Sequence, residues 1–237
     1  MRYTKIGIIG AMAEEVKLVE QDLRQTKITI QAGMSFYEGL FFDVPIVLCK
    51  SGVGKVNAAV CTQILIDRFS VDCILFTGVA GALDPELNIG DIVISSDCMQ
   101  HDVDVRALGF ALGVIPYAES SIFTADPELV DRAFHSSKQL FGSRILKGRV
   151  LSGDQFIADR DKVKQLHLEL SGVCTEMEGA AVAQVCQMNS IPFVIIRSMS
   201  DKADGSAHIN FSEFTQLASD NSYRLIAHMV KGLRGQI

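Results

Sequence analysis

The sequence lacks the spacings that mark common metal and cofactor sites. Its 5 histidines are scattered without an HxxxH or HExxH pair, its 6 cysteines include no CxxC, and neither a P-loop nor a GxGxxG is present. Such spacings bring metal ligands together or cradle a phosphate group in backbone amides. We therefore expect neither a bound metal nor a cofactor.

Basic clusters and long apolar runs are also missing. With 22 Lys and Arg against 28 Asp and Glu, the formal net charge is −6. Nucleic-acid binding needs concentrated positive charge, so we expect no nucleic-acid partner. No apolar run reaches the roughly 20 residues of a membrane span, and we expect no membrane contact. Residues 1–15 have a basic start and a short apolar run, but Glu14 and Glu15 follow at once, which favours a strand over a signal peptide.

Apolar residues are plentiful, at 48% of the 237 residues. The cysteines lie one by one within apolar segments, as is typical of reduced core residues in a cytoplasmic protein. A chain of this length and composition is consistent with a single domain, residues 1–237.

Apolar runs of strand length alternate with helical patterns, which predicts an α/β domain with a central mixed sheet. The expected strands are residues 3–9, 26–31, 34–42, 45–50, 72–76, 92–96, 144–151, 173–177 and 193–197. The expected helices are one that begins near Glu14 and those at residues 55–69, 127–140, 162–170, 178–188 and 212–233. Residues 77–81 are predicted to form a turn, and residues 101–124 an irregular segment.

Glycines or acids follow nearly every predicted strand. Taken singly, each has an ordinary interpretation, such as an acid in the first turn of a helix or an N-cap. Taken together, they predict one crevice, because ligands of open α/β sheets bind outside the carboxyl ends of the strands. These residues are Glu15, Gly52, Gly54, Gly78, Gly81, Ser152, Gly153, Asp154, Glu176, Glu178 and Asp201.

Three of these acids, Glu15, Glu178 and Asp201, predict acid/base chemistry. The sequence offers no nucleophilic Ser or Cys in a recognisable setting. Such acids suit a reaction through a cationic, sugar-like transition state. One acid would hold a water, one would hold ribose hydroxyls, and one would protonate a leaving group.

The motifs around these residues resemble those of the bacterial 5′-methylthioadenosine/S-adenosylhomocysteine nucleosidases over essentially the whole chain. They occur in the same order as in that family. They are IGIIGAM (6–12) with Glu14 and Glu15, SGVGKV (51–56), TGVAG (77–81), SGDQFI (152–157), EME (176–178) and SD (200–201).

This resemblance implies a nucleoside phosphorylase-type fold, with a central mixed and partly closed sheet surrounded by helices in three layers. It also implies hydrolysis of the N-glycosidic bond of 5′-methylthioadenosine and S-adenosylhomocysteine, and of 5′-deoxyadenosine as well. The products would be adenine and the 5-substituted ribose.

The resemblance also implies a role for each acid. Glu15 would position and activate the attacking water. Glu178 would bind the ribose hydroxyls, with Met177 packed beneath the sugar. Asp201 would donate a proton to N7 of adenine, and Ser200 would support its carboxylate.

Further residues are implied to line the substrate pocket. Phe156 would stack on the purine, and Ile157 would contact the base edge through its backbone. The other implied substrate-binding residues are Gly81 and, at the alkylthio end, Met12, Val53 and Phe211.

The family is homodimeric, and its partner subunit closes the pocket with residues that match Leu108 and Pro116. An aromatic residue is common in the family at the position of Leu108, so this chain departs from the pattern at the thioether end. We therefore expect a homodimer whose pocket differs there in shape.

Two other functions remain open at this point. A purine nucleoside phosphorylase of the same fold would need cations for phosphate, and many such enzymes carry Arg where this chain has Phe76. With Glu15 nearby, that position predicts no cationic anion site. A binding or storage protein that has lost catalysis would not need Glu15, Glu178 and Asp201 together.

Overall fold

Two strands that are buried along their whole length form the centre of the fold. The computed structural model describes residues 3–142, 144–202 and 207–234, with the backbone alone for 207–213 and 234. In it, β5 (Cys73–Ala82) and β10 (Phe193–Asp201) run parallel, side by side, and are buried at every position. Strands with such continuous apolar runs are typical of sheets covered on both faces.

These two strands belong to one mixed ten-stranded sheet, in the order β10-β6-β8-β9-β5-β1-β4-β3-β2, with β7 paired to β6. Because β10 also pairs with β5, the strands β5, β10, β6, β8 and β9 close into a ring. The predicted mixed, partly closed sheet is confirmed. The other strands are β1 (Ile6–Gly10), β2 (Arg24–Gln31), β3 (Met34–Phe41), β4 (Val44–Lys50), β6 (Ile92–Gln100), β7 (Ile122–Thr124), β8 (Ile145–Ser152) and β9 (Gly172–Glu176).

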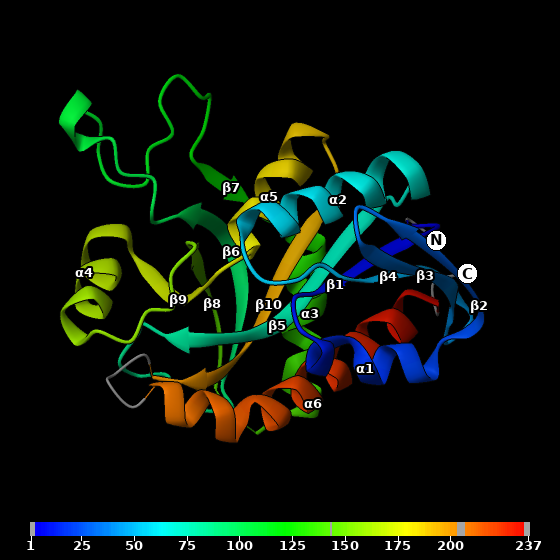
Figure 1. Cartoon of the computed structure of the whole chain (residues 1–237). Helices are drawn as coiled ribbons and strands as arrows, with labels where there is room; N and C mark the ends of the chain where they lie inside the picture. Colours follow the sequence, from blue (N-terminus) through cyan, green and yellow to red (C-terminus); the bar gives the residue numbers. More distant parts are fainter. Residues whose placement is uncertain (1–2, 143, 203–206, 235–237) are drawn as a thin grey trace.

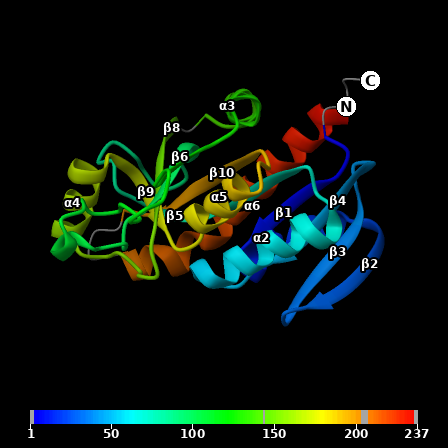
Figure 2. The same ribbon diagram turned by 90° about the horizontal axis from the view of Figure 1, so that it is seen from above.

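Helices cover both sides of the sheet (Figures 1 and 2). α2 packs against α5 on one side, and α6 packs against α1 and α3 on the other. The helices are α1 (Ala13–Asp22), α2 (Lys55–Phe69), α3 (Pro127–Leu140), α4 (Arg160–Leu170), α5 (Gly179–Met188) and α6 (Ala207–Arg234), with a short 3-10 turn, η1 (Arg106–Leu108). Among the helices that the structure describes, none is both long and apolar enough to cross a membrane.

Local chemistry sets several helix boundaries. The Asp126 carboxylate accepts a hydrogen bond from the Leu129 N–H, and Pro127 follows it at the first helical position of α3. Asp159 caps α4 in the same way through the Lys162 N–H. The predicted helices at residues 55–69 and 127–140 match α2 and α3 to the residue.

The predicted turn at residues 77–81 is wrong, because β5 continues through it to Ala82. Two neighbours keep these residues in the sheet: β10 pairs with them on one side, and β9 pairs with Gly81 and Ala82 on the other. The glycine-rich composition predicted a turn, but at Gly78 the missing side chain instead lets the Glu15 carboxylate lie close to the strand. β10 likewise extends past the predicted end at Arg197 to Asp201.

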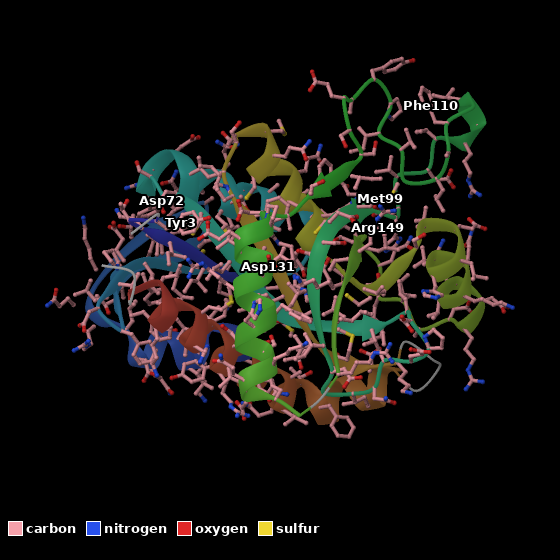
Figure 3. The ribbon with its side chains drawn as sticks, turned by 180° about the vertical axis from the view of Figure 1, so that it is seen from behind. Tyr3, Asp72, Met99, Phe110, Asp131 and Arg149 are labelled. Atoms are coloured by element: carbon pink, nitrogen blue, oxygen red, sulfur yellow. The ribbon has the colours of Figure 1, made fainter. Side chains whose placement is uncertain are left out.

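Smaller differences concern the ends of elements. β1 begins at Ile6, three residues later than predicted, and α6 begins at Ala207, before the predicted Ser212. The irregular segment after β6 contains η1 and the short β7. It projects from the body of the molecule in Figure 1, and Phe110 marks it in Figure 3. All six cysteines are unpaired and buried, as predicted.

Candidate active site

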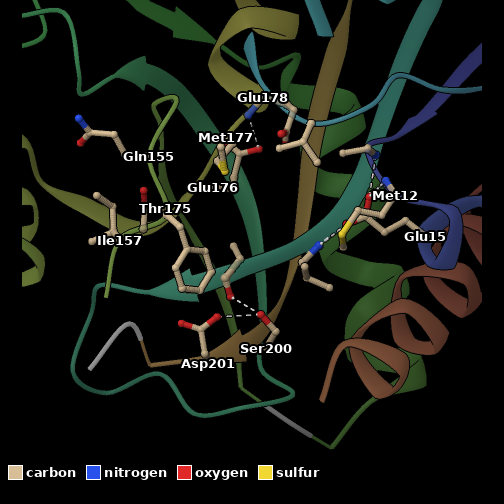
Figure 4. A pocket seen from close by; sticks show the side chains of 16 residues that line it. Met12, Glu15, Gln155, Ile157, Thr175, Glu176, Met177, Glu178, Ser200 and Asp201 are labelled. Atoms are coloured by element: carbon tan, nitrogen blue, oxygen red, sulfur yellow. Dashed lines mark hydrogen bonds between the residues drawn. The ribbon is translucent and has the colours of Figure 1, made fainter. Parts of the chain in front are cut away.

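One pocket lies where the ends of β1, β4, β5, β8, β9 and β10 converge (Figure 4). Of the residues after the strands that were expected to share one crevice, five line this pocket: Glu15, Gly81, Glu176, Glu178 and Asp201. The other six do not line it: Gly52, Gly54, Gly78, Ser152, Gly153 and Asp154. Its walls are apolar apart from four acids and a few hydroxyl and amide groups. The lining residues are Ala11, Met12, Glu15, Val53, Val79, Ala80, Gly81, Gln155, Phe156, Ile157, Thr175, Glu176, Met177, Glu178, Ser200 and Asp201.

Three backbone N–H groups hold the carboxylate of Glu15. Its Oε2 accepts hydrogen bonds from Ala11 at 2.6 Å and Met12 at 3.0 Å, and its Oε1 accepts one from Val79 at 3.0 Å. A Cβ at Gly78 would lie 2.5 Å from Glu15 Oε1, so any other residue there would displace the carboxylate. Oε1 keeps a second lone pair for another donor. The carboxylate is therefore fixed in position and can still accept a proton from a bound molecule.

Burial raises the pKa of Glu15 above its usual value, while Arg197 and the three N–H groups oppose that rise. A carboxylate with a raised pKa is a stronger base than one in water.

Glu178 lies at the N-terminus of α5 and is also buried. Its Oε1 accepts a hydrogen bond from the Gly54 N–H at 2.7 Å, and its Oε2 has no hydrogen-bond partner among the residues that the structure describes. Burial and the nearby Glu176 raise the pKa of Glu178 to about 8, against the opposing effects of the Gly54 N–H and Arg197. One oxygen is thus anchored, and the other is available to a ligand in the pocket.

Glu176 and Arg197 form a buried ion pair beneath these acids. Arg197 Nη2 donates to Glu176 Oε2 at 2.5 Å, and the guanidinium stacks on the Phe76 ring at 4.0 Å. Glu176 also accepts hydrogen bonds from the Ser152 hydroxyl and from the Gly179 N–H. This network fixes the turn from β9 into α5 that carries Glu178.

Arg197 received no role from the sequence, although its guanidinium places one cation beside the acids of the site. The guanidinium is 1% exposed, and its Nε–H has no hydrogen-bond partner in the described part of the chain. The sequence contained a signal for this pair, because an arginine within an otherwise apolar strand is buried and needs an acid as its partner. Glu15, Glu176 and Glu178 nevertheless outnumber this single cation, so the region disfavours a phosphate dianion.

Asp201 lies at the last position of β10, where a bulge shifts the register with β5 between Met199 and Asp201. The bulge re-aims side chains at the end of the strand. The Ser200 hydroxyl donates to Asp201 Oδ2 at 2.9 Å, and Asp201 is 2% exposed. In Figure 4, Ser200 and Asp201 lie on a different wall from Met12 and Glu15.

The apolar walls contain most of the other residues expected in the pocket. Met177 and Ile157 are largely buried, whereas Val53 and Phe156 are about half exposed at 51% and 52%. Two large apolar side chains at the rim with this exposure leave one end of the pocket open in a single chain.

Three expected pocket residues are not seen in this pocket. Leu108, which is 71% exposed, and Pro116 lie on the projecting segment after β6, away from the pocket of their own chain. The side chain of Phe211 lies outside the described residues. The structure adds six residues to the pocket that the sequence did not single out as catalytic or substrate-binding: Ala11, Val79, Ala80, Gln155, Thr175 and Glu176.

The fold and the site define a nucleoside-cleaving class of protein. A partly closed mixed sheet with acids at the strand ends around an apolar pocket is the arrangement expected of the nucleoside phosphorylase fold. The family model described as "Phosphorylase superfamily" matches residues 5–231.

More specific relatives lie within that superfamily. The 5′-methylthioadenosine/S-adenosylhomocysteine nucleosidase of Tolumonas auensis is 40% identical over 230 residues, covering 97% of this chain and 100% of the relative. The crystal structure of the corresponding nucleosidase from Colwellia psychrerythraea, in complex with adenine, has a TM-score of 0.93 at 38% identity and covers 99% of this chain and 98% of that chain. The chain belongs to the 5′-methylthioadenosine/S-adenosylhomocysteine nucleosidase family.

A structure with a different name is also similar. The futalosine hydrolase of Helicobacter pylori has a TM-score of 0.92 at 33% identity, covering 97% of this chain and 98% of that chain. The same fold therefore supports more than one nucleoside substrate.

Proposed function

We propose that this protein hydrolyses the N-glycosidic bond of 5′-methylthioadenosine and S-adenosylhomocysteine, releasing adenine and the 5-substituted ribose. The observation that carries the proposal is the placement of Glu15, Glu178 and Asp201 on different walls of one apolar pocket. Activity on 5′-deoxyadenosine stays a prediction.

Asp201 is proposed as the general acid. Adenine is a poor leaving group as an anion, and a proton on N7 lets it leave as a neutral molecule. Ser200 holds the carboxyl group of Asp201, and Phe156 and Ile157 provide an apolar wall for the purine. Breaking the bond between C1′ and N9 then transfers the bonding electrons to a protonated base.

Glu15 is proposed as the general base. Its fixed carboxylate accepts a proton from water while the water oxygen bonds to C1′. The negative charges of Glu15 and Glu178 also stabilise the positive charge that develops on the ribose. The proton taken up by Glu15 balances the proton that Asp201 gives to adenine.

Glu178 is proposed to bind the ribose hydroxyls through Oε2, with Met177 packing beneath the sugar. Its ionised form accepts hydrogen bonds from two hydroxyl groups. Since the pKa of Glu178 is raised to about 8, the ionised fraction increases as pH rises toward that value. We expect kcat/KM to rise over the same range.

The first prediction separates hydrolysis from phosphorolysis. Adenine release should proceed at the same rate in phosphate-free buffer and in millimolar phosphate, because the acids around Arg197 leave no net positive site for phosphate. The measurement is adenine release with analysis of the sugar product. A requirement for phosphate, or a ribose 1-phosphate product, would instead support a purine nucleoside phosphorylase.

The same assay can rank substrates. Methylthioadenosine, S-adenosylhomocysteine, 5′-deoxyadenosine and futalosine differ at the 5′ end or in the base. Futalosine is included because a futalosine hydrolase shares the fold at 33% identity. Preference for futalosine would revise the substrate and leave the chemistry unchanged.

A homodimer is also proposed, with Leu108 and Pro116 of each subunit closing the alkylthio end of the other pocket. An exposed apolar strip that runs from the pocket rim onto α2 supports it. Val53 at the rim precedes the helix, and Val56, 74% exposed, and Val60, 37% exposed, lie on the helix. An apolar surface that continues from a pocket rim is typical of an interaction site.

We predict a dimer at micromolar concentration by light scattering, and a shift toward monomer with lower activity in Val56→Asp. Ile30→Asp is a matched control, because Ile30 is also 74% exposed but lies on the edge strand β2. It should leave mass and activity unchanged. A stable and fully active wild-type monomer would contradict the proposal.

We further propose that residues 1–237 act as a single nucleosidase domain in the cytoplasm. The buried, unpaired cysteines support that location, because thiols persist in reducing compartments.

A further inference from the structure

The N-terminus of α2 is held by carboxylates from other parts of the chain. Gly54 occupies its N-cap position with φ 99° and offers no side chain to cap it. Glu178 instead accepts from the Gly54 N–H at 2.7 Å, and Asp154 Oδ1 accepts from the Lys55 N–H at 2.8 Å. Negative charge at this helix end is favourable, because the backbone N–H groups there are unsatisfied.

The Lys55 side chain completes a closed ring of interactions. Its Nζ donates to Asp102 Oδ1 at 2.6 Å, and Asp102 Oδ2 accepts from the Asp154 N–H at 2.9 Å. The ring closes with the hydrogen bond from the Lys55 N–H to Asp154 Oδ1. Nζ also donates to Gln100 Oε1 at 2.9 Å.

This ring differs from an ordinary surface ion pair. The side chains of Lys55 and Asp102 are only 18% and 15% exposed, so solvent screens their attraction weakly. A cation in the first turn of a helix is normally unfavourable. Here the ammonium group lies against Asp102 and Gln100 at the end of β6, which offsets that cost and fixes the start of α2.

We propose that Lys55 is a positioning residue for Glu178. Its ion pair with Asp102 fixes the N-terminus of α2. Gly54, the residue before Lys55, is held in place with it, and the Gly54 N–H anchors Glu178 Oε1. This inference rests on the proposed role of Glu178 in ribose binding. It adds a residue that does not touch the substrate and acts through one that does.

The ring also joins Glu178 to the segment that carries Leu108 and Pro116. Asp102 lies at the beginning of that segment, two residues after the end of β6. The ion pair that holds the start of α2 therefore also contacts the first residues of this segment.

The test is a double-mutant cycle between Lys55→Met and Glu178→Gln. We expect Lys55→Met alone to lower kcat/KM for methylthioadenosine by about 10- to 100-fold, as small misplacements of binding groups do. In the Glu178→Gln background, Lys55→Met should lower kcat/KM by less than about 2-fold, because the carboxylate that Lys55 positions is already absent. Equal losses in both backgrounds would overturn the proposal.

The pH profile gives a second readout. Loss of the Gly54 N–H bond removes an interaction that lowers the pKa of Glu178, so the rising limb of kcat/KM should move to higher pH in Lys55→Met. The other ionisable groups that act on Glu178 are Glu176, Arg197 and Glu15, and the variant leaves them in place. An unchanged limb would count against a positioning role.

Two further variants serve as an alternative to Lys55→Met and as a control for it. Asp102→Asn breaks the same ion pair with nearly the same shape, and it should reproduce the cycle if Lys55→Met folds poorly. Lys147→Met removes another lysine–aspartate pair, with Asp131 at 2.5 Å between β8 and α3, and should leave kcat/KM unchanged. If the wild-type protein hydrolyses the nucleoside and Glu178→Gln is impaired, the proposed function is supported whatever the result of the double-mutant cycle.

Discussion

Asp201→Asn is expected to lower kcat for adenine nucleosides by about 100- to 10,000-fold, the usual contribution of a general acid. Asparagine keeps the shape of the side chain and the contact with Ser200, but it has no proton to give to N7. Binding of a substrate analogue should therefore persist. The measurement is kcat and KM for methylthioadenosine, with inhibitor affinity as the check on folding.

The leaving group provides the sharper comparison. The nitrophenolate of a nitrophenyl riboside leaves as an anion without protonation. Asp201→Asn should therefore regain much of the wild-type kcat on that substrate. If the variant is equally inactive on both substrates while its fold and inhibitor binding are intact, Asp201 orients the purine or supports the structure and is not the acid.

Glu15→Gln should lower kcat by a similar factor on both substrates. The attacking water loses its base whatever the leaving group is, so an activated riboside cannot rescue the variant. The amide also places an NH₂ group where three backbone N–H donors now meet the carboxylate. Some loss of stability is expected as well, and a thermal melt distinguishes it from loss of chemistry.

The pair of variants forms one experiment with opposite outcomes. Rescue of Asp201→Asn and failure of Glu15→Gln on the nitrophenyl riboside would support the assigned roles. Rescue of Glu15→Gln would show that the water does not depend on Glu15, and the base would have to be sought elsewhere in the pocket.

Much of the site could be predicted from the sequence because its parts follow the strands. Acids or glycines after most of the predicted strands indicated a shared crevice, and Glu15, Glu178 and Asp201 do line one pocket. The helices at 55–69 and 127–140 could be placed because apolar periodicity and, for the second, the Asp126-Pro127 start are local features.

Other features depend on contacts between distant segments. Residues 77–81 have the composition of a turn, but pairing with β10 and β9 keeps them in a strand. Glycine at position 78 is explained only by the carboxylate of Glu15, which arrives from a different element.

The sequence by itself determined the α/β class, the reduced core cysteines, the resemblance to a nucleosidase family and the three acids. These rest on composition, on the period of apolar residues and on short motifs, all of which are properties of neighbouring residues. The tertiary structure decided the buried Arg197–Glu176 pair and the ring through Lys55, Asp102 and Asp154. Each joins residues 21 to 99 positions apart, and only the closure of the sheet brings their charges into contact.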